Sequence, residues 1–390
     1  MITAHKIALD PNNVQATHLA RAAGTARLAY NWALAESGRQ YEAHKADRSQ
    51  PRPSEGALRR QLNAIKREQF PWMTGVTKNA PQMAIMQLGV AFKNFFAGRA
   101  CYPKFRKKGV RDRFTVTNDQ LQIEGKRVRI PVLGWVRMRE SLRLSGKILS
   151  ATASRVADRW FVSITIDTPD ALPQAKNHGA VGVDLGLRTL ATLSTGEKIV
   201  GPKAHKALLG RLRRLSRSLS RKVKGSANRN KARAKLAKLH AKIANVRADS
   251  LHQRTTDLTR RFSVIGIEDL NVSAMVSNCR LSRAVSDMGF FEFRRQLDYK
   301  AARLGGVVFV ADRWFPSSKT CSCCGYQIDE LPLKIRERVC PECAVVHDRD
   351  KNAAINLKVL AESSSVSACR EVRVLPASVT QEPSTEATHA

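Results

Sequence analysis

The chain has 390 residues, enough for two or three domains with cores of their own, and its hydrophobic fraction of 43% excludes a disordered tail protein. Its 67 Lys and Arg residues against 33 Asp and Glu residues give a net charge of +34, which predicts nucleic acid as the partner. The sequence contains neither an apolar run of about eighteen residues nor a signal-peptide core. We therefore expect a soluble, cytoplasmic, nucleoid-associated protein that has no membrane partner.

The N-terminal part of the chain has helical periodicity. Apolar residues recur at three- and four-residue steps over 14–46, which predicts a helix. A second helix is predicted from "NAPQ" through "MAIMQLGVAFKNFF", with Ile85, Leu88, Phe92 and Phe95 on one face and a loop, "DRSQPRPSEG", between the two helices. Residues 11–100 are therefore predicted to form a helical module, and we expect its aromatic side chains in the core.

The next segment alternates between polar and apolar residues. A basic loop, "CYPKFRKKGVRDRF", leads into period-two stretches, with turns at Gly125 and near Asp158. Residues 101–170 are predicted to form antiparallel strands in a small β-barrel, to which residues 1–10 add a strand. The helical module would then be an insertion in this β domain, which the linker "DTPDALPQAKN" closes.

From residue 178 the pattern changes to an α/β one. "GAVGVDLGL" and "RFSVIGIEDL" read as buried strands, and "RTLATLSTGEKIV" completes a hairpin. The segment 203–260 is helical and basic, with only Asp249 and Asp257 as acids, so it predicts a helical hairpin that faces phosphates. The Ser-, Thr- and Pro-rich tail over 363–390 is predicted to be disordered.

Two C-x2-C pairs separated by fifteen residues predict a zinc site, because two such knuckles can present four thiolates tetrahedrally. The predicted ligands are Cys321, Cys324, Cys340 and Cys343. Cys323 could replace Cys324, but the resulting C-x-C pair would close a poorer chelate ring. Four thiolates leave no open coordination position, so the zinc would be structural. The remaining cysteines, Cys101, Cys279 and Cys369, are expected to be inert.

Two acidic residues end predicted buried strands, and a third begins a helix. Asp184 follows "VGV" and Glu268 follows "VIGI", while "DRDKNAAINL" opens a helix whose Asp350, Ala353, Ala354 and Leu357 share one face. The two alanines allow this helix to lie close to the sheet and bring Asp350 toward the other acids. Three such carboxylates can hold two Mg²⁺ ions for attack of water on a phosphodiester. Asp348 is expected to cap the helix.

Several motifs together resemble the TnpB family of prokaryotic insertion sequences, which is related to type V CRISPR effectors. They are "RLAYNWAL", "AFKNFF", "YPKFRKKG", "GVDLGL", "IEDLN", "RWFPSSKTCSCCG" and "CPECAVVHDRDKNAAINL", and they span the chain up to about residue 360. Ala344 stands where the family usually has a glycine, and Cys323 is extra. Neither difference affects the three acids.

The resemblance implies a RuvC-like nuclease domain of the RNase H fold over 178–310 and 348–362, with an inserted zinc ribbon over 311–347. It also implies a β-barrel wedge domain over 1–10 and 101–170 that carries a helical recognition domain over 11–100. The implied activity is RNA-guided DNA cleavage. A guide RNA from the element's end would pair with double-stranded target DNA next to a short adjacent motif, and one site with Asp184, Glu268 and Asp350 would cut both strands. Protein partners are unknown.

Two alternatives stay open: an RNA-guided DNA-binding regulator without cleavage, which would expect one of the acids to be replaced, and a transposase that joins DNA strands. A structure-specific resolvase or ribonuclease would leave the N-terminal half without a role. For the leading interpretation, base pairing supplies sequence specificity, and the protein supplies charge and metal chemistry. The predicted nucleic-acid contacts are Lys104, Arg106, Lys107, Lys108, Arg211, Arg213, Arg214, Arg217 and Arg221.

Overall fold

The computed structural model describes residues 2–168, 179–332 and 334–372, and the chain divides into two compact units, Met1–Ala171 and Leu172–Ala390. No helix in the described ranges is both long enough and apolar enough to cross a membrane.

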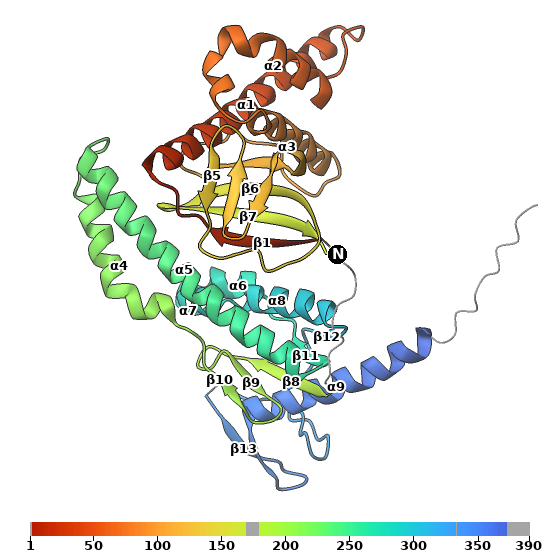
Figure 1. Cartoon of the computed structure of the whole chain (residues 1–390). Coiled ribbons are helices and arrows are strands. Elements are labelled where there is room, and N and C mark those ends of the chain that lie inside the picture. The colour runs from red at the N-terminus through yellow and green to blue at the C-terminus, as the bar shows by residue number, and fades with distance from the viewer. Residues whose placement is uncertain (1, 169–178, 333, 373–390) are drawn as a thin grey trace, which may run out of the picture. The chain divides into compact units, whose positions relative to one another are not determined.

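The first unit contains three long helices (Figure 1). They are α1 (Asn13–Ala46), α2 (Glu55–Gln69) and α3 (Asn79–Phe96), with a 3-10 turn at Pro71–Gly75. The helix predicted over 14–46 is confirmed, and Asn12 forms a capping box with Gln15 at its start. Helix α2 was not predicted, because its sequence is mostly polar and buries only Leu58 and Leu62.

The strands of the first unit form two antiparallel sheets. One has the order β1-β7-β6-β2 and the other the order β3-β4-β5, and a single bridge joins Leu9 to Met138. The N-terminal strand pairs with β7, as predicted. The pairings describe two sheets linked at one point, so the closed barrel stays a prediction. The bounds are β1 Ile2–Ala8, β2 Arg113–Thr117, β3 Gln122–Glu124, β4 Arg127–Ile130, β5 Gly134–Arg137, β6 Lys147–Val156 and β7 Arg159–Asp167.

The second unit is built on a five-stranded sheet of order β10-β9-β8-β11-β12. The strands are β8 (Ala180–Leu185), β9 (Ala191–Leu193), β10 (Lys198–Ile199), β11 (Val264–Glu268) and β12 (Val307–Ala311). β11 is parallel to both β8 and β12, whereas β9 is antiparallel to β8. A further two-stranded sheet pairs β13 (Glu337–Val339) with β14 (Val346–Asp348).

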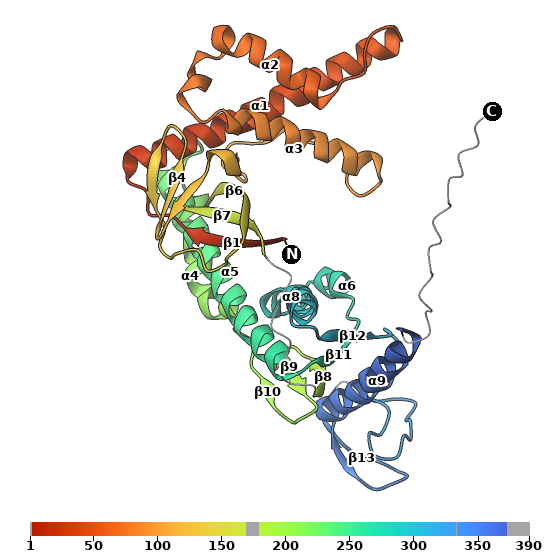
Figure 2. The same ribbon diagram turned by 45° about the vertical axis from the view of Figure 1, so that its right-hand side comes forward.

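Helices cover both faces of this sheet, with α5 and α8 on one side and α9 on the other (Figures 1 and 2). Val181, Val183, Ile265 and Ile267 point toward α5 and α8, because they share one buried cluster with residues of those helices. The α4–α5 hairpin extends beyond the sheet. The bounds are α4 Ala204–Ser220, α5 Ala227–Arg261, α6 Val272–Ser277, α7 Ser282–Met288, α8 Phe290–Arg303 and α9 Arg349–Val372.

The end of α9 differs from the sequence prediction. The predicted disordered tail begins at residue 363, but the helix continues to Val372, and residues 373–390 lie outside the described part of the chain. The Ser-rich stretch suggested a tail, yet it contains neither glycine nor proline before Pro376, so nothing in it terminates a helix.

Candidate metal centres and nucleic-acid surfaces

Asp184 and Glu268 lie on neighbouring parallel strands. The strand register pairs Gly266 with Gly182 and Ile267 with Val183, so Glu268 and Asp184 occupy the next step along the two strands. Successive side chains of a strand point to opposite faces, and the apolar residues between them point toward α5 and α8. Both carboxylates therefore face the side of the sheet that α9 covers, at its carboxyl edge.

Two glycines bring α9 onto the sheet. A Cβ atom on Gly182 would lie 1.8 Å from the carbonyl oxygen of Ala354, and one on Gly266 would lie 2.3 Å from that of Leu357. The helix backbone thus rests directly on the β8–β11 pair. On the helix side, Ala354 and Leu357 are fully buried, as the sequence predicted. This close packing fixes where the first turn of α9, and with it Asp350, stands relative to the strand ends.

The three acids interact electrostatically. The pKa of Asp184 is raised well above its usual value, first by burial and then by the charges of Glu268 and Asp350. A buried carboxyl with two acidic neighbours is costly unless a cation compensates it. Asp184 is therefore close enough to both other acids for their charges to act on it, and the cations Arg349 and Arg336 oppose this effect in part.

Glu268 and Asp350 are each held by a residue from the segment between β12 and α9. The Ser317 hydroxyl donates to Glu268, and the Arg336 guanidinium donates to Asp350 at 3.0 Å. The acids are therefore less tightly grouped than the cysteines. Within the described ranges, the four cysteines form the one set of three or more potential metal ligands whose atoms all lie within 4.8 Å of one another.

Asp348 has the capping role that the sequence predicted. Its Oδ1 accepts hydrogen bonds from the backbone N–H groups of Asp350 and Lys351, both at 3.0 Å. Its Oδ2 accepts from Lys198 at 2.9 Å. Burial works to raise its pKa, but the hydrogen bonds from Lys351 and Lys198 hold this pKa below its usual value. Asp348 thus directs its carboxylate to the helix start.

A cavity of about 220 Å³ adjoins Glu268. Arg294 and Arg313 line it, and Asp269 holds both guanidinium groups through ion pairs of 2.7 and 2.6 Å. Two cations fixed beside a carboxylate can bind a phosphate of a nucleic-acid strand. The neighbouring phosphodiester bond of that strand would then lie at the acids. Residue spacing does not single out these arginines, because only the fold brings them next to Glu268.

The four predicted zinc ligands converge. The Sγ atoms of Cys321 and Cys343 are 3.7 Å apart, and those of Cys324 and Cys340 are 3.6 Å apart. A tetrahedral zinc–thiolate site with bonds of about 2.3 Å has sulfur–sulfur edges of about 3.8 Å. The donor set and its spacing therefore fit zinc. Cys324 lies in the cluster and Cys323 is exposed outside it.

Two asparagines of α9 connect the first knuckle to the acid site. The side-chain amide of Asn352 donates to the carbonyl of Thr320 at 2.7 Å, and its Oδ1 accepts from the backbone N–H of Ser322 at 2.9 Å. Asn356 donates to the carbonyls of Ser317 and Thr320, both at 2.8 Å. Hydrogen bonds thus join the first cysteine knuckle to the first turns of α9, the helix that carries Asp350. The sequence did not reveal this connection.

The predicted basic contacts divide into groups. Arg211 and Arg214 line a cavity of about 510 Å³ between α4 and α5, together with Lys235, Lys238 and Lys242. Arg213, Arg217 and Arg221 are exposed outside its lining. We call this cavity, lined by these five cations, the hairpin groove.

In the first unit, Lys104, Lys107 and Lys108 are exposed. Arg106 differs from them, because its guanidinium stacks on Tyr30 at 3.6 Å and donates to Gln87 at 3.0 Å. Its backbone also exchanges hydrogen bonds with Asn31. Arg106 is therefore engaged in packing, which sequence alone could not distinguish from the exposed lysines beside it.

Comparison with family profiles finds three matches. Residues 163–278 match a family described as "Probable transposase", and residues 290–357 match the "Cas12f1-like, TNB domain" family. Residues 1–46 match a "Helix-turn-helix domain", although the structure of this segment is strand β1 followed by the single long helix α1.

Similar proteins cover nearly the whole chain. A "Putative RNA-guided DNA endonuclease" from Streptomyces pristinaespiralis is 39% identical, over 94% of this chain and 90% of that protein. The "Putative RNA-guided DNA endonuclease InsQ" from Escherichia coli K12 is 33% identical, over 98% and 97%. The protein of the "Cas12f1-sgRNA-target DNA complex" superimposes with a TM-score of 0.54 at 13% identity, over 89% of this chain and 83% of that one. The last likeness shows a shared fold.

Proposed function

The chain belongs to the TnpB family of insertion-sequence proteins, and from this premise we propose that it is an RNA-guided, metal-dependent DNA endonuclease. Two observations support the proposal: Asp184 and Glu268 lie near the ends of adjacent parallel strands on the face that α9 covers, and the charge of Asp350 acts on Asp184. The relatives' names support the same activity. In this proposal residues 178–310 and 348–362 are the RuvC-like nuclease domain and 311–347 the zinc ribbon. The first unit comprises the wedge and recognition domains.

The three carboxylates are the proposed ligands of two Mg²⁺ ions. When bound, such ions supply charge compensation and an activated water for in-line attack on a phosphodiester. The protein's own groups position the site: Ser317 orients Glu268, Arg336 balances Asp350, and the glycine contacts set the height of α9 above the sheet. Arg294 and Arg313 are placed to hold a phosphate beside Glu268.

Guide RNA and double-stranded DNA are the proposed partners. Pairing of the RNA with one DNA strand, next to a short adjacent motif, would select the target, and the single carboxylate site would cut both strands. Lys104, Lys107 and Lys108 are candidates for the RNA or adjacent-motif surface, since all three are exposed. The exposed Arg213, Arg217 and Arg221 and the hairpin groove are the corresponding candidates on the second unit.

The test is cleavage by isosteric variants. The protein is produced with its native flanking DNA, and the RNA that accompanies it is sequenced to define a matching plasmid target. Asp184→Asn, Glu268→Gln and Asp350→Asn each abolish cutting while the bound RNA is unchanged. Asp348→Asn is the matched control and keeps cutting, because asparagine caps helices as well as aspartate does. Full cutting by Asp350→Asn overturns the assignment of this acid.

The same preparation separates the alternatives. A wild-type complex that binds the target but never cuts it, in Mg²⁺ or Mn²⁺, is a regulator. One that joins the cut ends to other DNA is a transposase. Metal analysis tests the second centre: we expect one zinc per chain, lost in Cys321→Ser and Cys340→Ser and retained in Cys323→Ser. Well-folded protein without zinc contradicts the structural role.

A further inference from the structure

Four aromatic side chains form an exposed cluster at the end of α3. Phe92, Phe95 and Phe96 lie on one face of the helix, and Tyr102 from the following loop packs against the first two at centroid distances of 5.6 and 5.3 Å. Phe96 stacks on Phe92 at 6.2 Å and contacts Phe95 at 5.2 Å. We call these four residues the aromatic platform.

The platform continues the core stripe of α3 out into solvent. Ile85 and Leu88 on the same helix are 1% exposed, and Phe92 packs against the core from a half-buried position. Phe96, in contrast, is 79% exposed and Tyr102 is 51% exposed. The expectation that the aromatic residues of 11–100 lie in the core is therefore wrong for Phe96, as it is for the exposed Tyr41 and Trp72. An exposed apolar cluster of this kind on a folded chain is typical of a surface that a binding partner covers.

The surrounding charge indicates what covers it. The sequence from residue 69 to residue 111 contains no Asp or Glu, and the cations nearest the platform in sequence are Lys93, Arg99 and Lys104. The acid Glu55 reaches Gly89, one turn before Phe92, but it is paired with Arg59 at 2.9 Å. The ring of Tyr102 meets those of Phe92 and Phe95 at interplanar angles of 78° and 86°, so ring edges pack against ring faces. The ring of Phe96, at the outside of the cluster, is left open. Open aromatic rings in a segment that carries cations suit bases and phosphates of a single-stranded nucleic acid.

We propose that the aromatic platform stacks unpaired bases of the guide RNA, while Lys93, Arg99 and Lys104 contact the adjacent phosphates. This inference rests on the proposed function and identifies where RNA, as distinct from DNA, is bound. Within the proposed function, RNA is the favoured occupant because the protein would hold its guide before it meets a DNA target, and an apolar surface left bare until then would promote aggregation.

The test uses substitutions that separate stacking from apolar contact. Phe96→Leu and Tyr102→Leu keep apolar area but remove the ring, and Phe96→Trp keeps a ring. The probe is a fluorescein-labelled 20-nucleotide oligoadenylate RNA, measured by anisotropy at several salt concentrations. The double Leu variant binds it at least about fivefold more weakly, the lower limit for the stacking of one base, and Phe96→Trp binds as well as the wild type.

Salt dependence gives a second readout. Loss of stacking leaves the slope of log affinity against log salt unchanged, whereas Lys104→Gln lowers its magnitude by about 0.7 for a single strand. All of these side chains are exposed or half-exposed, so the variants fold, and circular dichroism verifies this. Equal binding by the double Leu variant and the wild type overturns the platform while leaving the proposed function intact. Failure of the wild type to bind any RNA overturns the proposed function itself.

Two other occupants have distinct signatures. If the double Leu variant is monomeric where the wild type sediments as a dimer, the platform is an interface between copies and the RNA proposal is wrong. If the platform variants lose affinity for a 20-nucleotide oligodeoxyadenylate and not for the RNA, it holds DNA and the proposal is equally wrong.

Discussion

At the scale of single residues, Gly182 and Gly266 decide where Asp350 stands. They are paired across β11 and β8, and both meet the backbone of α9 at distances too short for any Cβ atom. A glycine inside a strand usually weakens it, but here it allows a helix backbone to approach the sheet. The acid site therefore depends on two residues that carry no functional group.

We expect Gly182→Ala to push α9 off the sheet. The added Cβ meets the Ala354 carbonyl at 1.8 Å, so the unfolding free energy falls by about 3 kcal/mol, the cost of a severe overpacking. Cleavage falls with it, because Asp350 moves. Gly210→Ala is the control: no atom lies within 4 Å of its Cβ position in α4, and the substitution stabilises a helix by about 0.5–1 kcal/mol. Denaturant titration of both variants distinguishes the two effects, and a wild-type stability in Gly182→Ala contradicts the contact.

Ala344 is strained at the second cysteine knuckle. Its φ is +56°, whereas Gly325, at the matching position of the first knuckle, has a φ of +80°. A left-handed conformation costs a residue with a Cβ about 1–2 kcal/mol. This is the position at which the family usually has glycine, so the departure seen in the sequence has a physical cost in the structure.

We predict that Ala344→Gly strengthens zinc retention and that Gly325→Ala weakens it. No atom lies within 4 Å of a Cβ at Gly325, so backbone strain is the only term that this second variant adds. The expected changes are about 1 kcal/mol in opposite directions, or roughly fivefold in the chelator concentration that removes the metal. Competition with a chromogenic chelator measures both. Changes of the same sign in the two variants contradict the argument.

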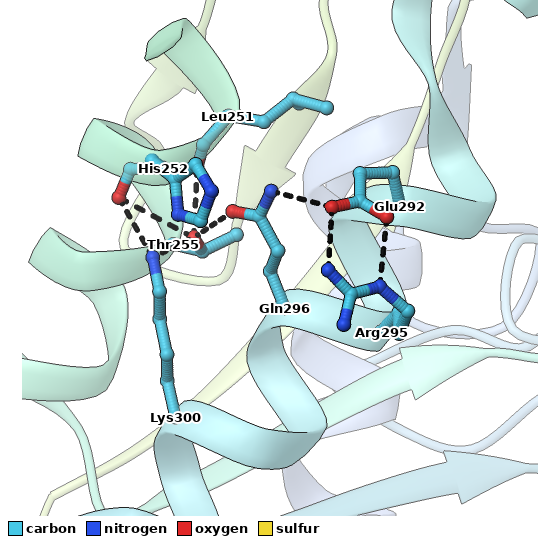
Figure 3. Close-up of polar contacts among 7 residues, drawn as sticks. All are labelled: Leu251, His252, Thr255, Glu292, Arg295, Gln296 and Lys300. Atoms are coloured by element: carbon cyan, nitrogen blue, oxygen red, sulfur yellow. Dashed lines mark hydrogen bonds and ion pairs between the residues drawn. The ribbon is translucent and has the colours of Figure 1, made fainter. Parts of the chain in front are cut away.

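At the scale of elements, a polar network joins α5 to α8 (Figure 3). Lys300 of α8 donates to the carbonyl of His252 and to the hydroxyls of Thr255 and Thr256, at 2.7–2.9 Å. Thr255 donates to Gln296 at 2.9 Å, and Gln296 donates to Glu292 at 2.9 Å. The network lies beside the buried cluster on the opposite side of the sheet from α9.

This network predicts a pH dependence of stability. Burial, and then repulsion from Arg260, lower the pKa of Lys300 from 10.5 to about 8. Between these values the unfolded chain binds more protons than the folded one, so the unfolding free energy increases as pH rises from about 8 toward 10.5. The expected gain is on the order of 1 kcal/mol, because the half-buried ammonium is partly screened. Lys300→Met removes this increment in denaturation measured at pH 8, 9 and 10, and equal slopes in the two proteins contradict it.

The hairpin groove gives a prediction about α4 and α5. Its cations come from facing sides of two helices, and only Asp249 and Asp257 are acidic along both. Arg214→Gln, Lys235→Gln and Lys242→Gln together should lower the salt slope of RNA binding by about 2 for single-stranded RNA. Lys222→Gln, Lys224→Gln and Lys231→Gln remove the same charge at exposed positions outside the groove and should change it less. If the two triple variants change the salt slope equally, the groove contributes no more than general surface charge and the prediction is wrong.

Much of the secondary structure could be predicted because it depends on local periodicity. The helices of 14–46 and 79–96, the strands that carry Asp184 and Glu268 near their C-terminal ends, and the cysteine register all follow from residue spacing. What could not be predicted depends on distance between segments. The contacts of Gly182 with α9, of Asn352 with Thr320 and of Arg336 with Asp350 join residues whose types are ordinary on their own. The exposure of Phe96 was hidden by a periodicity that is identical to that of a core helix.

At the scale of the whole molecule, the prediction of a TnpB-family protein is confirmed by relatives that match nearly its full length. Its charge is spread over both units. Residues 1–171 contain 29 Lys and Arg against 13 Asp and Glu, a net charge of +16, and the remainder of the chain has +18. The buried clusters are also separate, since one is confined to 7–166 and the others to 181–297. Each unit thus has its own core and its own attraction for a polyanion.

We expect fragments 2–168 and 179–372 to fold and to bind the oligoadenylate RNA separately, each more weakly than the intact chain. When one RNA contacts both units, counterion release adds, so the salt slope of the intact protein should approach the sum of the fragment slopes. Thermal unfolding tests folding, and anisotropy at several salt concentrations tests additivity. One fragment could fold but show a salt slope near zero, while the other fragment has the slope of the intact protein. The positive charge of the first fragment would then have no part in holding RNA. The charge of that unit would then be free to engage the DNA duplex alone.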